Sequence, residues 1–328
     1  MRSRLALVVA IAVALAAVAF AVVRFATAPG PPPVARASLP AKLASYLGVF
    51  ENGSPPSYGP LEGFARAAGR RPSLVGYFSG WAEPFQLSFA ESLRAHGAIP
   101  FVQIDPTLAS IPGIAGGVYD DYLGQFADSV RRFGSPVVIG FCHEMNAPWY
   151  PWGFKHVSPA TFKSAWRHIV DLFRARGARN VTWLWTVNAL RPPGAPDRAG
   201  GIGPLQRWWP GQNYVTWIGI DGFYYSQDNT FKTLFAPTIR QVRQFTNLPV
   251  LLSETAVGPA AGQFLKIQNL FNGMSSARTL GLVWFDNSQH AGIFHQDWRI
   301  EDNQGAEISF RFSVRNDLRP PPPINVSP

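Results

Sequence analysis

With 328 residues, 47% of them hydrophobic and 15% charged, the chain is long and apolar enough to bury the core of one large catalytic domain. Its 29 Lys and Arg exceed its 20 Asp and Glu, but the charges are scattered, so they give no support to a nucleic-acid partner. The single cysteine, Cys142, excludes an intrachain disulfide, and its position at the end of an apolar run predicts a small buried side chain.

The first 24 residues predict a membrane anchor or a signal peptide. Arg2 and Arg4 carry positive charge and precede an uninterrupted apolar run at 5–23. The run approaches the roughly 20 residues that a membrane-spanning helix needs, whereas the Ala-Arg-Ala pattern at 35–37 would suit cleavage of a signal peptide. Both interpretations stay open. Each predicts an extracytoplasmic protein, either membrane-anchored or secreted.

Residues 25–42 are rich in Pro and Ala, which predicts an extended spacer. The folded domain is expected over 43–318, as a monomer. A Pro-rich tail, 319–328, follows it and has no assigned function.

Eight short apolar or β-branched runs alternate with segments of helical periodicity. The expected strands are 45–50, 73–78, 99–104, 136–141, 181–186, 215–220, 250–253 and 281–285. The expected helices are 61–68, 85–95, 121–133, 162–175, 231–245, 264–274 and 306–314. Strand–helix alternation predicts parallel strands joined by crossovers, and eight such units favour the α/β class and a single (β/α)8 TIM barrel.

Two of the expected strands lead into a glutamate. Glu144 follows the run 136–141, and Glu254 follows the run 250–253. Strand ends of a (β/α)8 barrel converge over one mouth, and hydrolysis of a glycosidic bond needs two carboxyl groups that flank it. Three aromatic residues just after Glu144 (Trp149, Tyr150 and Trp152) would suit packing against sugar rings. The pattern indicates sugar chemistry.

At these residues the chain resembles glycoside hydrolase family 26, whose best-known members are β-mannanases. The resemblance covers about 45–316. It rests on His143-Glu144-Met145-Asn146 with Trp149 and Trp152, on Ser253-Glu254, on Val283-Trp284-Phe285-Asp286, and on Asp297-Trp298-Arg299-Ile300. It implies a retaining mechanism on a (β/α)8 barrel.

The resemblance also implies roles for single residues. Glu144 would be the general acid and then the base, and Glu254 the nucleophile that forms a covalent glycosyl-enzyme. His143, Trp149 and Trp284 match positions that bind the sugar around the cleaved bond. A tyrosine near the end of the sixth strand would contact the nucleophile. We expect Tyr224 there, because a phenol donates a hydrogen bond and the neighbouring Phe223 cannot.

One position departs from the family pattern. Many members carry an arginine where this chain has Gly140, so local charge and hydrogen bonding differ. The glycine either makes room for a bulkier neighbour such as Phe141, or it marks an altered sugar site with weakened catalysis.

A zinc hydrolase is the obvious alternative for His143-Glu144. The helical zinc motif requires a second histidine at the position of Ala147, so the motif is absent. We therefore expect no catalytic metal and no cofactor.

The expected partner is a polysaccharide, and the expected activity is that of an endo-acting β-1,4-mannanase. Mixed-linkage β-glucan, β-1,3-xylan and an envelope exopolysaccharide stay open as substrates, as does a glycan-binding protein without catalysis. Polar or aromatic residues at other strand ends also stay candidates for lining the groove: Glu51, Trp81, Gln103, Asp105, Asn188 and Asp221.

Overall fold

The computed structural model describes residues 39–190, 204–259, 261–289 and 296–322. The expected anchor or signal peptide, most of the spacer and the end of the Pro-rich tail lie outside these ranges. None of the helices within them is both long and apolar enough to span a bilayer. The fate of residues 1–24 and the extracytoplasmic location stay predictions.

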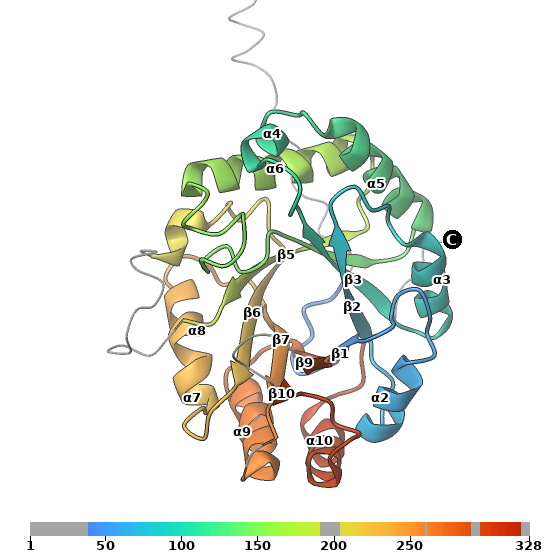
Figure 1. Ribbon diagram of the computed structural model, residues 1–328, viewed down its shortest axis with the longest axis vertical. Helices are drawn as coiled ribbons and strands as arrows, with labels where there is room; N and C mark the ends of the chain where they lie inside the picture. The colour runs from blue at the N-terminus through green and yellow to red at the C-terminus, as the bar shows by residue number, and fades with distance from the viewer. Residues whose placement is uncertain (1–38, 191–203, 260, 290–295, 323–328) are drawn as a thin grey trace, which may run out of the picture. The chain divides into compact units, whose positions relative to one another are not determined.

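Eight parallel strands close into a barrel in the order of the sequence, as Figure 1 shows. They are β1 (Tyr46–Glu51), β2 (Leu74–Gly80), β3 (Ile99–Asp105), β4 (Val137–Phe141), β5 (Val181–Asn188), β6 (Trp217–Tyr224), β7 (Val250–Val257) and β8 (Gly281–Asp286). Each overlaps its expected range. The predicted (β/α)8 TIM barrel is confirmed.

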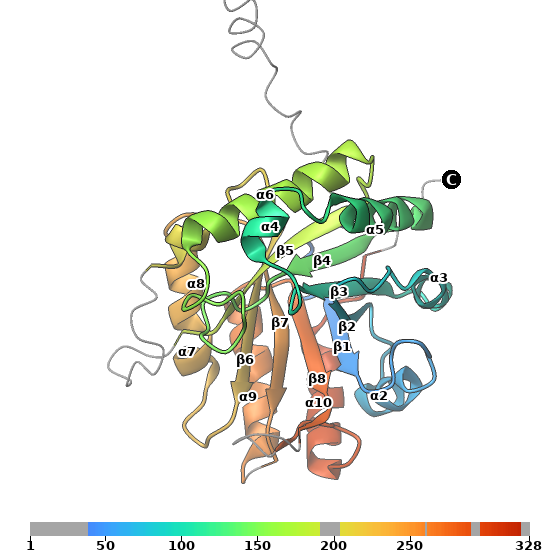
Figure 2. The ribbon, with the colours of Figure 1, turned by 45° about the horizontal axis from the view of Figure 1, so that its top comes forward.

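Helices surround the ring of strands in both views (Figures 1 and 2). They are α2 (Leu61–Ala68), α3 (Leu87–Ala95), α4 (Ile111–Ala115), α5 (Asp120–Phe133), α6 (Pro159–Ala175), the 3-10 helix η1 (Leu205–Trp208), α7 (Phe231–Leu234), α8 (Ala236–Val242), α9 (Gln263–Ser276) and α10 (Gln304–Asp317). After β8, two strands of two residues each form a separate small sheet: β9 (Ser288–Gln289) and β10 (Gln296–Asp297).

Two details differ from the expected helices. The segment 231–245 forms α7 and α8 instead of one helix, and Pro237 lies in the first turn of α8, where its missing N–H is tolerated. The short elements α4 and η1 were not expected, because five and four residues are too few to show a helical period.

Apolar side chains fill the lower part of the barrel interior. They come from all eight strands and include Tyr46, Phe50, Leu74, Ile99, Phe101, Val138, Leu184, Trp217, Leu251 and Val283. Space for the Phe50 ring comes from a glycine: a Cβ at Gly76 would lie 2.6 Å from that ring. This packing closes the barrel floor and leaves polar chemistry to the end where the strands finish.

Strand β7 carries a bulge at the catalytic end. Its pairing with β6 runs from Gly219↔Leu251 to Asp221↔Glu254, so β7 advances three residues while β6 advances two. A bulge re-aims the side chains around it. Here it brings Glu254 into the electrostatic range of Glu144 and Asp221.

The close approach of the Phe50 ring to Gly76 predicts that a larger residue at position 76 destabilises the fold. Gly76→Ala would force a methyl group into the Phe50 ring, and we expect a loss of about 1–3 kcal/mol in the free energy of unfolding. Urea denaturation of the full chain measures this loss. The control is Gly63→Ala in α2, where the nearest heavy atom lies 3.9 Å from the new Cβ; helix propensity there predicts a gain of about 0.5–1 kcal/mol. Equal stability of Gly76→Ala and the unaltered protein would contradict the account.

Candidate active site

Glu144 reaches the barrel mouth from a turn just after β4. Its backbone adopts a left-handed conformation with φ of 52°, which is uncommon for a residue other than glycine. Cys142, two residues earlier, is also left-handed, with φ of 51°. The backbone N–H of Glu144 donates to the carbonyl oxygen of Thr186 on β5 at 3.1 Å. Backbone strain of this kind persists only where its surroundings hold it, and it gathers at functional sites.

Two donors hold the carboxylate of Glu144. Trp149 Nε1 donates to Oε2 at 3.0 Å, and Asn188 Nδ2 donates to Oε1 at 2.6 Å. Asn188 is itself fixed by Asn146, which accepts from its backbone N–H at 2.7 Å and donates to its carbonyl oxygen at 2.8 Å. Glu144 is only 6% exposed, whereas Trp149 is 59% exposed. The acid is therefore positioned, and the indole beside it keeps a face open to a ligand.

His143 is held on both sides of its ring. Nδ1 lies 3.0 Å from Asp105 Oδ1, and Nε2 lies 3.0 Å from the Tyr150 hydroxyl. Trp152 stacks on Tyr150 at 4.5 Å and donates to the His143 carbonyl oxygen. Burial favours the neutral ring, but the hydrogen bond and charge of Asp105 outweigh it and raise the pKa of His143. His143 is therefore fixed in place beside Glu144, and its raised pKa favours the protonated, positively charged ring.

Glu254 lies across the mouth among other acidic groups. It is 7% exposed, and its Oε1 has no hydrogen-bond partner among the described residues. Asp221, fully buried on β6, accepts from Ser253 Oγ at 2.6 Å and from the backbone N–H of Glu254. These two hydrogen bonds hold the bulge of β7 against β6 and fix the position of the Glu254 backbone.

Burial raises the pKa of both glutamates. For Glu144 the charge of His143 and the bonds from Asn188 and Trp149 oppose the rise, whereas for Glu254 the charges of Asp221 and Glu144 add to it. The rise is therefore larger at Glu254. In the ligand-free site, a proton shared by the pair favours Glu254.

Gly140 has a local explanation. A Cβ at this position would lie 1.8 Å from Oε1 of Gln103, so the Gln103 side chain on β3 occupies the space of the missing side chain. The bulkier neighbour is Gln103 and not Phe141, whose ring packs outside the barrel against Trp166 of α6. The chain thus replaces a guanidinium with a neutral amide from the adjacent strand.

Two expected sugar-site residues lie on the outer face of the barrel wall. The Tyr224 hydroxyl donates to Asn269 of α9 at 3.3 Å, and the phenol is buried. Trp284 is fully buried, with Phe310 of α10 against its ring at 4.8 Å. Side chains alternate along a strand, so a step of one residue exchanges the two faces. Neither ring offers a face to a sugar here.

The inward aromatic residues are the sequence neighbours of these two. Phe285 lies between Phe50 and Phe223, at 6.3 and 5.6 Å. Tyr225 is 38% exposed, and its pKa is raised by burial and then by the charges of Glu144 and Glu254. Near the end of β6, the phenol that senses the acid pair is therefore that of Tyr225 and not Tyr224; Tyr150, after β4, senses the pair as well.

The remaining positioning groups were only loosely expected. Asp105, Asn188 and Asp221 were candidates for lining the groove, whereas the roles of Tyr150 and Asn146 were missed. Their closeness to the His143-Glu144 motif was the available signal. Spacing along a loop does not reveal which atoms its folding brings together.

A pocket of about 400 Å³ lies at the ends of β1, β2 and β8; its lining includes Glu51 but neither Glu144 nor Glu254. Phe78 lines it, is 41% exposed, and lies 5.5 Å from the His143 ring. An exposed aromatic face next to a catalytic centre suits a sugar ring. Among the described residues, the acidic group with spacing suited to a metal ion is Glu51, Asp286 and Glu301, which includes neither Glu144 nor Glu254.

Comparisons with known sequences agree with this geometry. Over 278 residues, 80% of this chain, the sequence is 27% identical to Endoglucanase H of Acetivibrio thermocellus, of which the match covers 29%. Beta-1,3-xylanase TXYA of a Vibrio species is 28% identical over 114 residues, 34% of this chain and 22% of that protein. Mannan endo-1,4-beta-mannosidase A and B of Caldalkalibacillus mannanilyticus is 24% identical over 111 residues, 32% and 20% of the two chains. The chain spans less than a third of the length of each relative.

Solved structures share the fold. A modular endo-beta-1,4-mannanase from Cellulomonas fimi superposes with a TM-score of 0.63 at 16% identity, covering 87% of this chain and 76% of that one. The YdhT protein from Bacillus subtilis gives 0.60 at 18% identity, covering 88% and 94%. The sequence model of glycosyl hydrolase family 26 matches residues 80–316, most of the barrel and both acids. The chain belongs to glycosyl hydrolase family 26.

Proposed function

We propose that the protein is a retaining, endo-acting hydrolase of a β-linked polysaccharide, with Glu144 as acid and base and Glu254 as nucleophile. The observation that carries this proposal is the pair of buried carboxyl groups, one just after β4 and one within β7, which act on each other electrostatically. Trp149 and Phe78, both exposed beside the pair, support binding of sugar rings on the two sides of the cleaved bond.

The reaction would follow a double displacement. Glu254 attacks the anomeric carbon while Glu144 passes its proton to the leaving glycosidic oxygen. Glu144 then takes a proton from water, and that water breaks the bond between sugar and Glu254. Trp149 and Asn188 keep the carboxyl group of Glu144 in place throughout.

Substrate binding has to redistribute the proton between the two acids. In the free site, donors favour ionised Glu144, but the first step needs a protonated Glu144 and an ionised Glu254. Sugar hydroxyl groups that donate to the unpartnered Oε1 of Glu254 would stabilise its charge. The glycosidic oxygen would then receive the proton displaced to Glu144.

β-1,4-Mannan is the first substrate class, as expected from the sequence, and the match to the mannan endo-1,4-beta-mannosidase supports it. One observation favours a second class. The match to Endoglucanase H covers 80% of the chain, against 32% for the mannosidase, which supports β-glucan.

Product release by the full chain from β-mannan, mixed-linkage β-glucan and β-1,3-xylan tests the proposal. We expect reducing ends from at least one polymer, and a loss of about 10³-fold or more in Glu254→Ala, which has no nucleophile. Glu91→Gln, an exposed carboxylate on α3, is the control and should keep full activity. Hydrolysis that survives in a folded Glu254→Ala variant would remove Glu254 from the mechanism.

The acid role of Glu144 has a separate test. Glu144→Ala should lose about 10²–10⁴-fold on the polysaccharide because the leaving oxygen receives no proton. An aryl glycoside with a good leaving group needs little protonation, so glycosylation of the enzyme should be largely spared there. Burst kinetics on the two substrates measure this difference. An equal loss on both would show that Glu144 is not the acid.

The pH dependence follows from the raised pKa values. The reactive enzyme holds one proton on the acid pair, so activity should fall at low pH when both acids are protonated and at high pH when both are ionised, which makes kcat/KM bell-shaped. Because both pKa values are raised, both limbs should lie above the ordinary glutamate value of about 4.3. A profile that stays flat down to pH about 4 would contradict the burial argument.

The two neighbouring tyrosines form a matched pair. Tyr225→Phe should lower kcat/KM, by about tenfold for one lost hydrogen bond to a charged group. Tyr224→Phe should keep kcat/KM and lose only the bond to Asn269, about 1 kcal/mol of stability. Steady-state kinetics and urea denaturation separate the two. The opposite pattern would restore Tyr224 to the site.

A further inference from the structure

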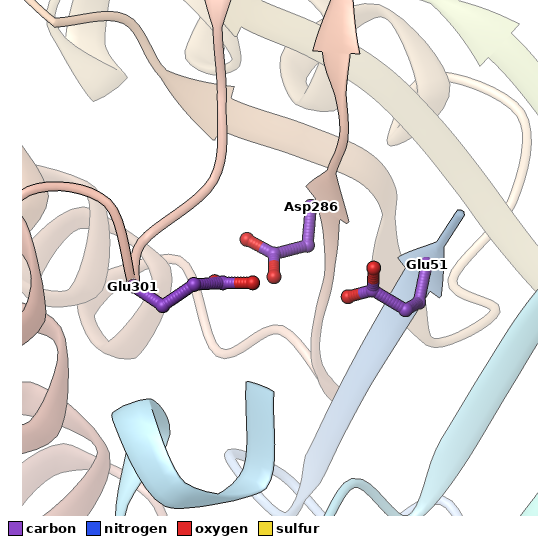
Figure 3. Close-up of side chains that lie close together, drawn as sticks. All are labelled: Glu51, Asp286 and Glu301. Atoms are coloured by element: carbon purple, nitrogen blue, oxygen red, sulfur yellow. The ribbon is translucent and has the colours of Figure 1, made fainter. Parts of the chain in front are cut away.

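Three acidic side chains from separate parts of the chain point at one another outside the catalytic mouth. Glu51 ends β1 and Asp286 ends β8, where the two residues are register partners. Glu301 lies in the turn before α10. One carboxylate oxygen from each lies within 4.8 Å of the other two, and Figure 3 shows the three groups facing a common point.

The trio lies behind the barrel wall and apart from the acid pair. Phe50 and Phe285, the preceding residues on β1 and β8, face the barrel interior. By alternation, Glu51 and Asp286 face outward. Oε1 of Glu301 lies 3.9 Å from the position of a Cβ on Gly63 of α2, so the trio occupies the space between the wall and that helix.

Two buried oxygens of the trio have no hydrogen-bond donor among the described residues outside the trio itself. Asp286 is fully buried; its Oδ1 accepts from the Ile300 backbone N–H at 3.0 Å, but its Oδ2 has no partner among the described residues. Oε2 of Glu51 is buried and unpartnered in the same way. Ionised carboxylates are acceptors only. Something positive must therefore sit between them, either a proton or a cation.

The nearest arginine does not fill this role. Arg299 Nε and Nη2 donate to Asp297 at 2.9 and 2.6 Å, and Nη2 also lies 2.5 Å from Asp302. The positive charge of Arg299 lowers the pKa of Glu51, but its guanidinium group is bound by the carboxylates of Asp297 and Asp302. Burial raises the pKa of Glu51 to about 7 and that of Asp286 to about 10, so without a cation the trio retains protons that a bound cation would displace.

We propose that Glu51, Asp286 and Glu301 form a binding site for a divalent cation, Ca²⁺. Ca²⁺ takes six to eight oxygen ligands at about 2.3–2.6 Å, so its ligands lie up to about 4.6–5.2 Å apart, a span that accommodates the trio. Mg²⁺ demands near-ideal octahedral geometry at about 2.0–2.1 Å and is usually held by one or two carboxylates, so three carboxylates suit Ca²⁺ better. Glu301 is exposed, which gives the ion an entry path and leaves room for water ligands.

The cation would act as a clamp. It joins the ends of β1 and β8, where the barrel closes, to the segment that leads into α10. That segment carries Trp298, which packs on Phe223 at 5.2 Å and accepts from Trp284 Nε1 at 2.9 Å. The ion takes no part in breaking the glycosidic bond, so its binding is measurable without any substrate.

The test is a Ca²⁺ titration of the full chain, purified in mild detergent, stripped with a chelator and desalted. Calorimetry should show one Ca²⁺ per chain. Thermal unfolding should shift upward by about 5 °C when free Ca²⁺ is about 100 times its Kd. Mg²⁺ should bind more weakly and shift the midpoint less.

Variants assign the site. Glu301→Gln, an exposed change that spares the buried pair, should weaken Ca²⁺ binding at least about tenfold and abolish the thermal shift. Asp286→Asn should do the same if it folds. Glu91→Gln on α3 is the control and should respond as the unaltered protein does.

Two results would overturn the proposal. If a folded protein shows neither heat nor a thermal shift with Ca²⁺ or Mg²⁺, a shared proton holds the trio together. If Glu301→Gln binds Ca²⁺ as tightly as the unaltered protein, the ion lies elsewhere.

Discussion

The site depends on the burial of several carboxyl groups at one end of a closed barrel. Water is withdrawn from Glu144, Asp221 and Glu254, and each loses the solvation that normally favours its charge. What then separates their roles is the supply of donors. Glu144 has an indole and an amide, Asp221 has a hydroxyl and a backbone N–H, and Glu254 keeps a buried oxygen without a described donor. Unequal hydrogen bonding is the means by which neighbouring acids acquire different chemistry.

The fold follows from patterns that one sequence displays openly. Each expected strand is a short run of apolar or β-branched residues, and a barrel strand buried on both faces needs such a run. The two acids were found because they directly follow such runs, and strand ends in this fold meet at one mouth. Position along the chain was enough for these residues, since it fixed the end of the barrel at which they lie.

The face of a strand is harder to predict than its end. In a strand apolar on both sides, alternation leaves no sequence signal for which residues point inward. Tyr224 and Trp284 were placed inside, but the inward residues are Phe223, Tyr225 and Phe285. The β7 bulge adds a further shift, because it changes the parity of every residue beyond it.

Gly140 illustrates another limit. A glycine is needed at position 140 because of Gln103, 37 positions earlier in the chain. The side chain of Gln103 fills the space that a side chain at position 140 would take. Neither residue alone predicts the exchange, since the two meet only through the pairing of β3 with β4. Both polar atoms of the Gln103 amide are buried without described partners, so the amide is placed to meet a polar ligand or a water molecule.

The inner and outer carboxylate groups obey the same electrostatics with different outcomes. At the mouth, donors and an open aromatic face leave the charge to be balanced by a substrate and by a mobile proton. Behind the wall, Glu51 and Asp286 meet a third acid, and the donors outside the trio leave one buried oxygen of each without a partner. A mobile proton is useful where a bond must break, whereas a fixed cation suits a place where strands must stay joined. Because β1 and β8 are the last strands to meet when the barrel closes in chain order, their shared end is where such a clamp would stabilise the fold most directly.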